Sequence, residues 1–190
     1  MNEEFVVTIG GPHGSGRSTI AKAVAEHYGL DRFSTGNVFR QFAKERGISV
    51  MELNKTAEKE IDIEVDKQSK EAGLKGNVVF ESDLAAWVNS EVPDKTVIKI
   101  WLDASPEKAG ERIFNDEKTR TSEKYNTLEE AIEAVRTRFA ADQARYKKYY
   151  DIDVLTLPYD KRINTDLLDV EGVKKEIFEF LDEKGLKHIE

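Results

Sequence analysis

The hydrophobic pattern of the chain alternates between short runs of β-branched residues and longer segments with helical spacing. The short runs predict strands at Phe5–Ile9, Asn77–Phe80, Thr96–Leu102 and Val154–Leu157. Apolar residues recur at three- and four-residue steps over Leu128–Tyr149, which predicts one long amphipathic helix, and Val173–Leu181 predicts a shorter one. Strands that alternate with helices indicate a parallel sheet with helices on both faces.

Several helix starts carry typical capping residues. Ser49 and Thr127 each stand three residues before a glutamate, as in a capping box. Ser105 precedes Pro106, a residue that suits the first turn of a helix. In contrast, Asn115–Asn126 is polar apart from one tyrosine and has helical flanks, so we predict a loop over the sheet.

Composition limits the class of protein. The chain has 190 residues, enough for one well-filled domain, and its formal net charge is −8. That charge argues against a nucleic-acid-binding surface but is compatible with a local cationic pocket. The absence of cysteine excludes disulfides and thiolate metal sites and is typical of a reducing compartment. We find neither a signal peptide nor a membrane span, and we predict a cytoplasmic single-domain protein.

A glycine-rich loop follows the first predicted strand and precedes a helical segment. Phosphate loops need glycines so that backbone N–H groups turn toward phosphate oxygens, and a helix start whose dipole favours the anion. They also need a hydroxyl that reaches Mg²⁺, a role that fits Ser18. The candidate ATP-binding residues are Gly11, Pro12, His13, Gly14, Ser15, Gly16, Arg17, Ser18 and Thr19. An ordinary glycine-rich turn is the alternative, whereas a dinucleotide loop is excluded because Thr19 takes the place of its last glycine.

A second phosphate site is expected about one strand–helix unit further on. Ser34 and Gly36 begin a helix, and Arg40 lies one turn into it, so N–H groups and a cation could hold a phosphate there. A solvated surface arginine is the alternative for Arg40.

Several segments, in order along the chain, carry a family resemblance. They are FSTGNVFRQFAKERGIS, EIDIEVDKQSKE, NVVFESDLAAW, IKIWLDASPEKAGERI, RFAADQARYKKYYDID and YDKRINTD. From about Val6 to about Ile177 the chain resembles the archaeal-type cytidylate kinases, which are small nucleoside monophosphate kinases. The resemblance implies an α/β three-layer sandwich with a five-stranded parallel sheet, and Mg²⁺-dependent transfer of the γ-phosphoryl group of ATP to CMP or dCMP. It also implies a core at 1–33 and 74–190, an acceptor-binding region at 34–73 and a lid at about 115–126.

The resemblance also assigns roles by position. The acceptor-binding positions are Ser34, Gly36, Arg40, Asp62, Asp66, Arg138, Asp142 and Arg145, and the catalytic arginines are Arg17, Arg112, Arg138 and Arg145, with Arg112 also binding ATP. Arg138, Asp142 and Arg145 stand at i, i+4 and i+7, so they share one helical face on which two cations and a carboxylate can clamp phosphates. A surface ion-pair ladder is the alternative.

Four positions depart from the family pattern, and two of them reverse the charge. Arg17 replaces the usual loop lysine, Lys67 an arginine of the acceptor helix, Asp83 the arginine of a Glu-Gly-Arg segment, and Asp116 the arginine at the start of the lid. Arginine and lysine are not equivalent between two phosphates, and phosphoryl transfer depends on such cations. Candidates to replace the missing charge are Lys118, Arg120, Lys124 and Arg136.

The metal partner and the substrate stay open at this point. Glu81 and Asp103 each follow a strand, where a carboxylate could hold Mg²⁺ through water or cap the next helix. Two alternatives to a cytidylate kinase are a kinase for another small acceptor and a nucleotide-binding protein with little transferase activity. We expect a monomer whose partners are two nucleotides.

Overall fold

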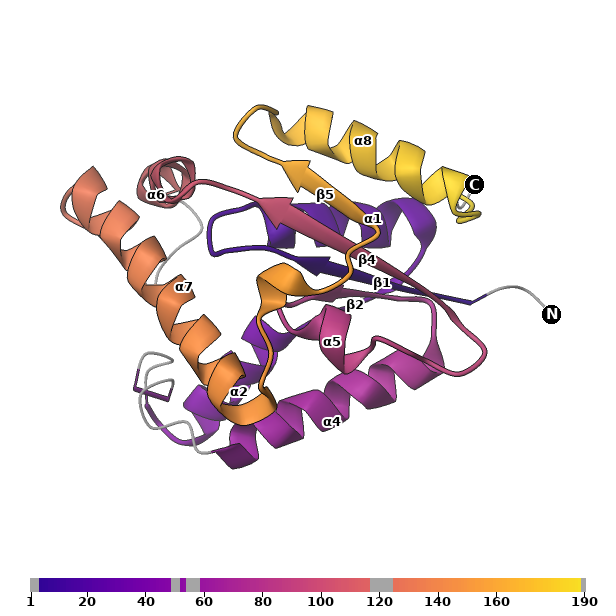
Figure 1. The fold of residues 1–190 in the computed structure, drawn as a ribbon, viewed down its shortest axis with the longest axis horizontal. Helices are drawn as coiled ribbons and strands as arrows, with labels where there is room; N and C mark the ends of the chain where they lie inside the picture. The colour runs from indigo at the N-terminus through magenta and orange to yellow at the C-terminus, as the bar shows by residue number, and fades with distance from the viewer. Residues whose placement is uncertain (1–3, 49–51, 54–58, 117–124, 189–190) are drawn as a thin grey trace.

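Five parallel strands form the centre of the molecule, in the order β2-β3-β1-β4-β5 (Figure 1). The computed structural model describes residues 4–48, 52–53, 59–116 and 125–188. The strands are β1 (Phe5–Gly10), β2 (Asp31–Ser34), β3 (Val78–Glu81), β4 (Thr96–Asp103) and β5 (Lys161–Asn164). All neighbouring strands pair in parallel, and the central strand β1 pairs with β3 and β4. The five-stranded parallel sheet implied by the resemblance is therefore confirmed.

Helices cover both faces of this sheet, which makes the three-layer sandwich (Figure 1). They are α1 (Arg17–Tyr28), α2 (Thr35–Glu45), α4 (Lys59–Lys75), α5 (Ala85–Val88), α6 (Pro106–Asn115), α7 (Leu128–Tyr150) and α8 (Val170–Glu183). The α1 and α8 helices share one hydrophobic core with the strands, while α5 and parts of α4 and α7 pack on the opposite face.

The buried strands explain why the sequence shows continuous apolar runs. Every residue of β1 is buried. Val7 and Ile9 pack in the core that includes α1 and α8, whereas Val6 packs on the other face. Successive side chains of a strand point to opposite faces, so a strand covered on both sides must be apolar at every position.

Three of the four predicted strands are present, and the fourth prediction is wrong. Residues Val154–Thr156 form a short 3-10 helix, which begins where the Asp153 carboxylate accepts a hydrogen bond from the Leu155 N–H at 2.9 Å. Val154 is apolar because it packs in the cluster around Trp101 and not because it belongs to the sheet. The last strand is instead β5, an edge strand in which Ile163 alone is buried.

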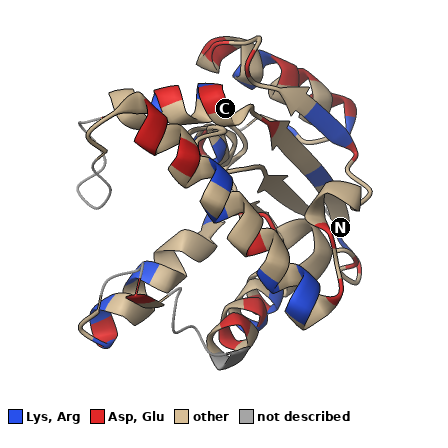
Figure 2. Ribbon diagram, turned by 60° about the vertical axis from the view of Figure 1, so that its left-hand side comes forward, with Lys and Arg blue, Asp and Glu red and all other residues tan. Residues whose placement is uncertain are grey.

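The predicted helix starts agree with the structure where it describes them. The Thr127 hydroxyl accepts a hydrogen bond from the Glu130 N–H at 3.2 Å, and Ser105 caps α6 with Pro106 in its first turn. Ser49 and most of the predicted lid, residues 117–124, lie outside the described residues. Acidic and basic residues are interspersed along the outer helices (Figure 2). Among the described residues no helix is long and apolar enough to cross a membrane.

Candidate active site

The glycine-rich loop joins β1 to α1 at the carboxyl edge of the sheet. Two of its glycines are required by close packing: a Cβ on Gly11 would lie 2.5 Å from the Leu102 carbonyl oxygen, and one on Gly14 would lie 2.7 Å from the Ala109 carbonyl oxygen. Both residues also have positive φ angles, 143° and 83°. The Ser15 Oγ is buried and has no hydrogen-bond partner among the described residues. The loop therefore offers polar groups beside the start of a helix, as an anion site requires.

Arg17, the cation of this loop, forms an ion pair with Asp83. Its Nη1 donates to an Asp83 carboxylate oxygen, and the two side chains are only 18% and 8% exposed. Burial lowers the pKa of Arg17, but the carboxylate of Asp83 and the neighbouring Tyr146 and Glu81 raise that pKa by more. Burial raises the pKa of Asp83, and Arg17 opposes the shift. By the resemblance, Asp83 takes the place of an arginine in a Glu-Gly-Arg segment, whereas in the structure its carboxylate pairs with Arg17 of the glycine-rich loop.

Glu81 lies beside the hydroxyl that was predicted to reach Mg²⁺. The Ser18 Oγ donates to a Glu81 carboxylate oxygen, and Arg32 Nη2 lies 2.9 Å from the other oxygen. Serine hydroxyls and carboxylates are the ligand types that Mg²⁺ prefers, so this pair fits the ion. Among the described residues no three His, Asp or Glu side chains are grouped as a protein-only metal site.

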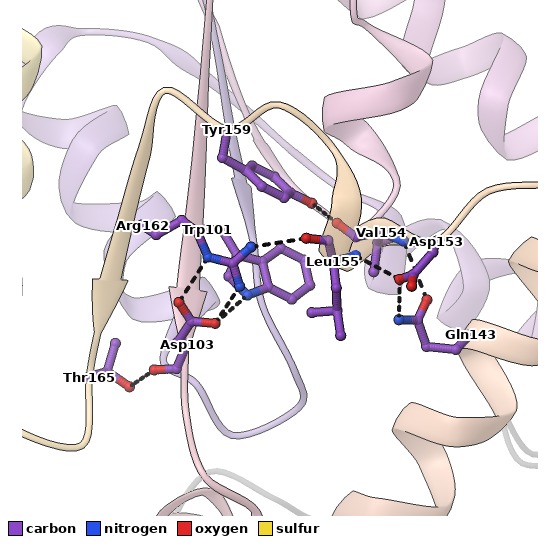
Figure 3. A network of polar contacts seen from close by, with 9 residues as sticks. All are labelled: Trp101, Asp103, Gln143, Asp153, Val154, Leu155, Tyr159, Arg162 and Thr165. Atoms are coloured by element: carbon purple, nitrogen blue, oxygen red, sulfur yellow. Dashed lines mark hydrogen bonds and ion pairs between the residues drawn. The ribbon is translucent and has the colours of Figure 1, made fainter.

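Asp103 belongs to a different network (Figure 3). One of its oxygens accepts from Trp101 Nε1 at 2.9 Å and from Arg162 Nη2 at 2.6 Å, and the other accepts from Arg162 Nε at 3.1 Å. Arg162 Nη1 also donates to the Leu155 carbonyl at 3.2 Å. These contacts connect β4 to β5 and to the 3-10 helix. Both carboxylate oxygens of Asp103 therefore accept hydrogen bonds from residues that hold the fold together.

Arg112 connects α6 to the loop and to the end of β5. Its Nη1 lies 3.4 Å from the Gly14 carbonyl and 2.9 Å from Thr165 Oγ1, and its Nη2 donates to the Thr165 carbonyl at 2.5 Å. The guanidinium is therefore held at the border of the loop by three hydrogen bonds. Thr165 was not predicted as part of the site, although it lies within the segment YDKRINTD that contributes to the resemblance.

The predicted charged face of α7 extends from the phosphate loop to α4. At one end, Arg138 Nη1 lies 3.4 Å from His13 Nε2. At the other end, Arg145 Nη2 lies 3.2 Å from Asp142, and its Nε lies 4.0 Å from an Asp62 oxygen. One helix thus brings cations to the nucleotide loop and to the acceptor-binding region that the sequence predicts.

The α4 carboxylates are held in a low-dielectric environment. Burial raises the pKa of Asp62, and the Arg145 charge opposes this shift. Burial also raises the pKa of Asp66, opposed by a hydrogen bond of 2.6 Å from the Tyr150 hydroxyl. The Asp62 Oδ2 and Arg145 Nε atoms are buried and have no hydrogen-bond partner among the described residues. These two atoms lie 4.0 Å apart and belong to opposite charges, so they form a buried ion pair between α7 and α4.

The other acceptor-side residues gather at the start of α2. The Ser34 hydroxyl caps this helix by accepting from the Asn37 N–H at 3.4 Å. Arg40 is exposed, its Nη2 lies 2.5 Å from Asn37 Oδ1, and its Nη1 lies 3.5 Å from the position of a Cβ on Gly36. Lys67 is exposed on α4. The structure therefore brings Ser34, Gly36 and Arg40 together, while Lys67 has a solvent-facing side chain.

Of the four proposed replacement cations, Arg136 lies within the described residues. Arg136 is half exposed and pairs with Glu107 and Glu133 on the outer side of α6 and α7. Lys118, Arg120 and Lys124 lie outside the described residues. The sequence analysis missed Tyr146, whose buried ring lies near the charges of Asp142, Asp83 and Arg145 and whose pKa is raised mainly by burial. Its only signal is that it directly follows Arg145.

Comparison with known proteins identifies the fold and the family of the chain. Shikimate kinase from Bacteroides thetaiotaomicron has the same fold, with a TM-score of 0.60 over 94% of this chain and 98% of its own, at 15% identity. A family model described as an AAA domain matches residues 10–152. The family match, together with the fold and the glycine-rich loop of this chain, places the protein in the class of phosphate-loop kinases.

Two curated relatives narrow this class. A cytidylate kinase from Methanocaldococcus jannaschii is 42% identical over 172 residues, which are 89% of this chain and 93% of the relative. One from Pyrococcus horikoshii is 40% identical over 174 residues, 90% of this chain and 85% of the relative. The chain belongs to the cytidylate kinase family, which confirms the resemblance found in the sequence.

Proposed function

We propose that the protein is a nucleoside monophosphate kinase that transfers the γ-phosphoryl group of ATP to CMP or dCMP. Membership of the cytidylate kinase family supports the reaction. The observation that carries the assignment of the site is the charged face of α7. It places Arg138 against the phosphate loop and Arg145 against Asp62, so the helix lies between a donor site and an acceptor site.

On the donor side, the loop residues Gly11–Thr19 bind the phosphates of ATP through backbone N–H groups and the start of α1. Arg17 supplies the loop's positive charge, and Arg112, fixed by Gly14 and Thr165, supplies a second cation at the border of the loop. Both guanidinium groups are oriented by contacts within the protein. Such preorganised cations stabilise the charge that develops on the equatorial oxygens during transfer.

Ser18 and Glu81 would hold Mg²⁺. When bound, the ion would neutralise charge on the nucleotide phosphates. We assign the carboxylate role to Glu81 and not to Asp103, because Glu81 contacts Ser18 whereas Asp103 is bonded to Arg162 and Trp101.

On the acceptor side, Ser34, Gly36 and Arg40 bind the phosphate of the monophosphate at the start of α2. The ion pair of Asp62 and Arg145 then lies beside its nucleoside, and Asp66 lies one turn further along α4. Arg138, Asp142 and Arg145 clamp the phosphates that meet between the two sites. An oxygen of the acceptor phosphate attacks the γ-phosphorus in line, with no covalent enzyme intermediate.

The test is release of ADP from ATP and Mg²⁺ with AMP, CMP, dCMP, UMP and GMP supplied one at a time. A clear preference for CMP and dCMP supports the proposal. Preference for another monophosphate would make the protein a kinase for that acceptor, and ATP binding without stimulation by any of them would make it a nucleotide-binding module. We also expect a cytoplasmic monomer, and light scattering after size exclusion tests the oligomeric state.

A further inference from the structure

One carboxylate, that of Asp83, contacts the phosphate loop at both of its ends. The backbone N–H of Gly11, where the loop leaves β1, faces this carboxylate and lowers its pKa. The carboxylate also pairs with the guanidinium of Arg17, where the loop enters α1. Both ends of the loop therefore face the same buried carboxylate.

The sheet fixes the position of this carboxylate. Asp83 follows β3, and the N–H of the preceding Ser82 donates to the Ile9 carbonyl of β1 at 3.2 Å. The Ser82 hydroxyl in turn accepts from the Leu84 N–H at 3.3 Å. The backbone is therefore held on both sides of Asp83, and the side chain is buried. For these two reasons the carboxylate has a fixed position beside the loop.

Arginine suits this arrangement better than lysine. The contact with Asp83 uses Nη1, and a guanidinium carries further N–H donors on two other nitrogens at fixed angles. One cation can therefore donate to a carboxylate and to a phosphate oxygen in different directions. A lysine has a single nitrogen, so an adjacent carboxylate would compete with the phosphate for it.

We propose that Asp83 is a positioning residue, which holds the loop in its phosphate-binding shape and directs Arg17 toward the phosphates of ATP. Arg17 and Asp83 then form a matched pair, and together they account for two of the four departures from the family pattern. The inference deepens the proposed function, because its turnover measurements rest on transfer to CMP. Its measurements of ATP binding need no acceptor and are therefore independent of the proposed function.

The test is a double-mutant cycle of Asp83→Asn, Arg17→Lys and the double variant, with Asp182→Asn as control. Asp182 also accepts a side-chain hydrogen bond, from Tyr28, but it lies on α8 away from the loop. For each variant we would measure the Kd for ATP without acceptor, kcat, the KM for CMP and the melting temperature. Asparagine keeps an acceptor for the Gly11 N–H and removes only the charge.

We expect Asp83→Asn to weaken ATP binding and to lower kcat by about tenfold or more, because a preorganised cation loses its orientation. The KM for CMP should stay within about twofold, and Asp182→Asn should leave ATP binding and kcat unchanged. Arg17→Lys should also lower kcat, and the double variant should be more active than Arg17→Lys alone, because its ammonium no longer faces a carboxylate. A carboxylate with only a structural role would not produce this rescue.

Wild-type ATP affinity and kcat in Asp83→Asn would overturn the proposal, and so would strictly additive effects in the cycle. If Asp83→Asn does not fold, Asp83→Glu replaces it. That variant keeps the charge but displaces the guanidinium, so unchanged kcat and ATP affinity would again refute the idea. If no monophosphate stimulates the wild type, the proposed function fails, and the cycle in ATP affinity still decides the role of Asp83.

Discussion

Replacing Arg145 by methionine would remove the cation that faces the nearly buried Asp62. The two side chains are 19% and 8% exposed, and Nε lies 4.0 Å from the carboxylate oxygen. At that distance two unit charges interact by about 4 kcal/mol in an environment of effective dielectric constant near 20. Loss of one partner of a buried pair costs about 3–5 kcal/mol, because the other charge stays in the interior. We expect Arg145→Met to lose about 3 kcal/mol of the free energy of unfolding at neutral pH.

The loss should depend on pH, in a direction set by Asp62. Burial already raises the pKa of Asp62 in the folded protein, and Arg145 opposes that rise, so its removal raises the pKa further. A carboxylate whose folded pKa exceeds its unfolded value stabilises the protein while it is protonated, and this contribution is lost as the pH rises through the folded pKa. The deficit of Arg145→Met should therefore be small near pH 4 and grow toward neutral pH.

Urea unfolding of the wild type and Arg145→Met across this pH range measures the effect. The double variant Arg145→Met with Asp62→Asn should recover much of the lost stability at neutral pH, because the carboxylate that remains beside position 145, that of Asp142, is 24% exposed whereas that of Asp62 is 8% exposed. Lys147→Met, which removes a cation from an exposed pair on the same helix, should change stability by less than about 0.5 kcal/mol. A deficit that is the same at every pH, or no recovery in the double variant, would refute this reasoning.

Other predictions test the loop, the metal ligands and the α4 contact. Gly14→Ala should abolish ATP binding in a titration, because the new Cβ would meet the backbone of α6. The control is Gly47→Ala, because Gly47 also has a positive φ but a Cβ there would meet no atom of the described residues within 4 Å. This control should lose only about 1 kcal/mol of the free energy of unfolding and keep ATP binding. Glu81→Gln should raise the Mg²⁺ concentration needed for half-maximal ADP release, whereas the exposed control Glu179→Gln should leave that concentration unchanged. An unchanged Mg²⁺ requirement in Glu81→Gln would show that Glu81 does not hold the metal. Tyr150→Phe should lower the free energy of unfolding by about 1 kcal/mol through loss of its hydrogen bond to α4, and equal urea midpoints would show that this bond contributes nothing.

The phosphate loop and the long helix could be predicted from sequence because their determinants are local. Glycine spacing, the preceding apolar strand and the following helix lie within Phe5–Tyr28. The shared face of Arg138 and Arg145 follows from helix geometry alone. Edge strands gave no such signal, because β2 and β5 have few buried positions and their sequences, DRFS and KRIN, are mainly polar. The prediction of a strand at Val154 was wrong because the apolar signal there comes from packing against the Trp101 cluster and not from a place in the sheet.

The pairing of Arg17 with Asp83 could not be predicted from sequence, since the two residues are 66 positions apart. They meet because β1 and β3 pair in parallel with Ile9 opposite Glu81, so the residues that follow each strand emerge side by side. Charge reversal at position 83 was visible in the sequence, but its partner depends on strand order. Tyr146 was missed for a similar reason, because one of the charges around it, that of Asp83, comes from a distant segment of the chain.

The placement of both arginine contacts on α7 has a consequence for how the enzyme changes shape. A helix rises about 1.5 Å per residue, so Arg138 and Arg145 keep a nearly constant separation of roughly 10 Å along its axis. If α7 moves away from the sheet by a rigid translation, Arg138 leaves His13 and Arg145 leaves Asp62 in the same step. The two contacts are therefore made or broken together in such a translation, and a state that keeps only one of them would require the helix to tilt or to bend.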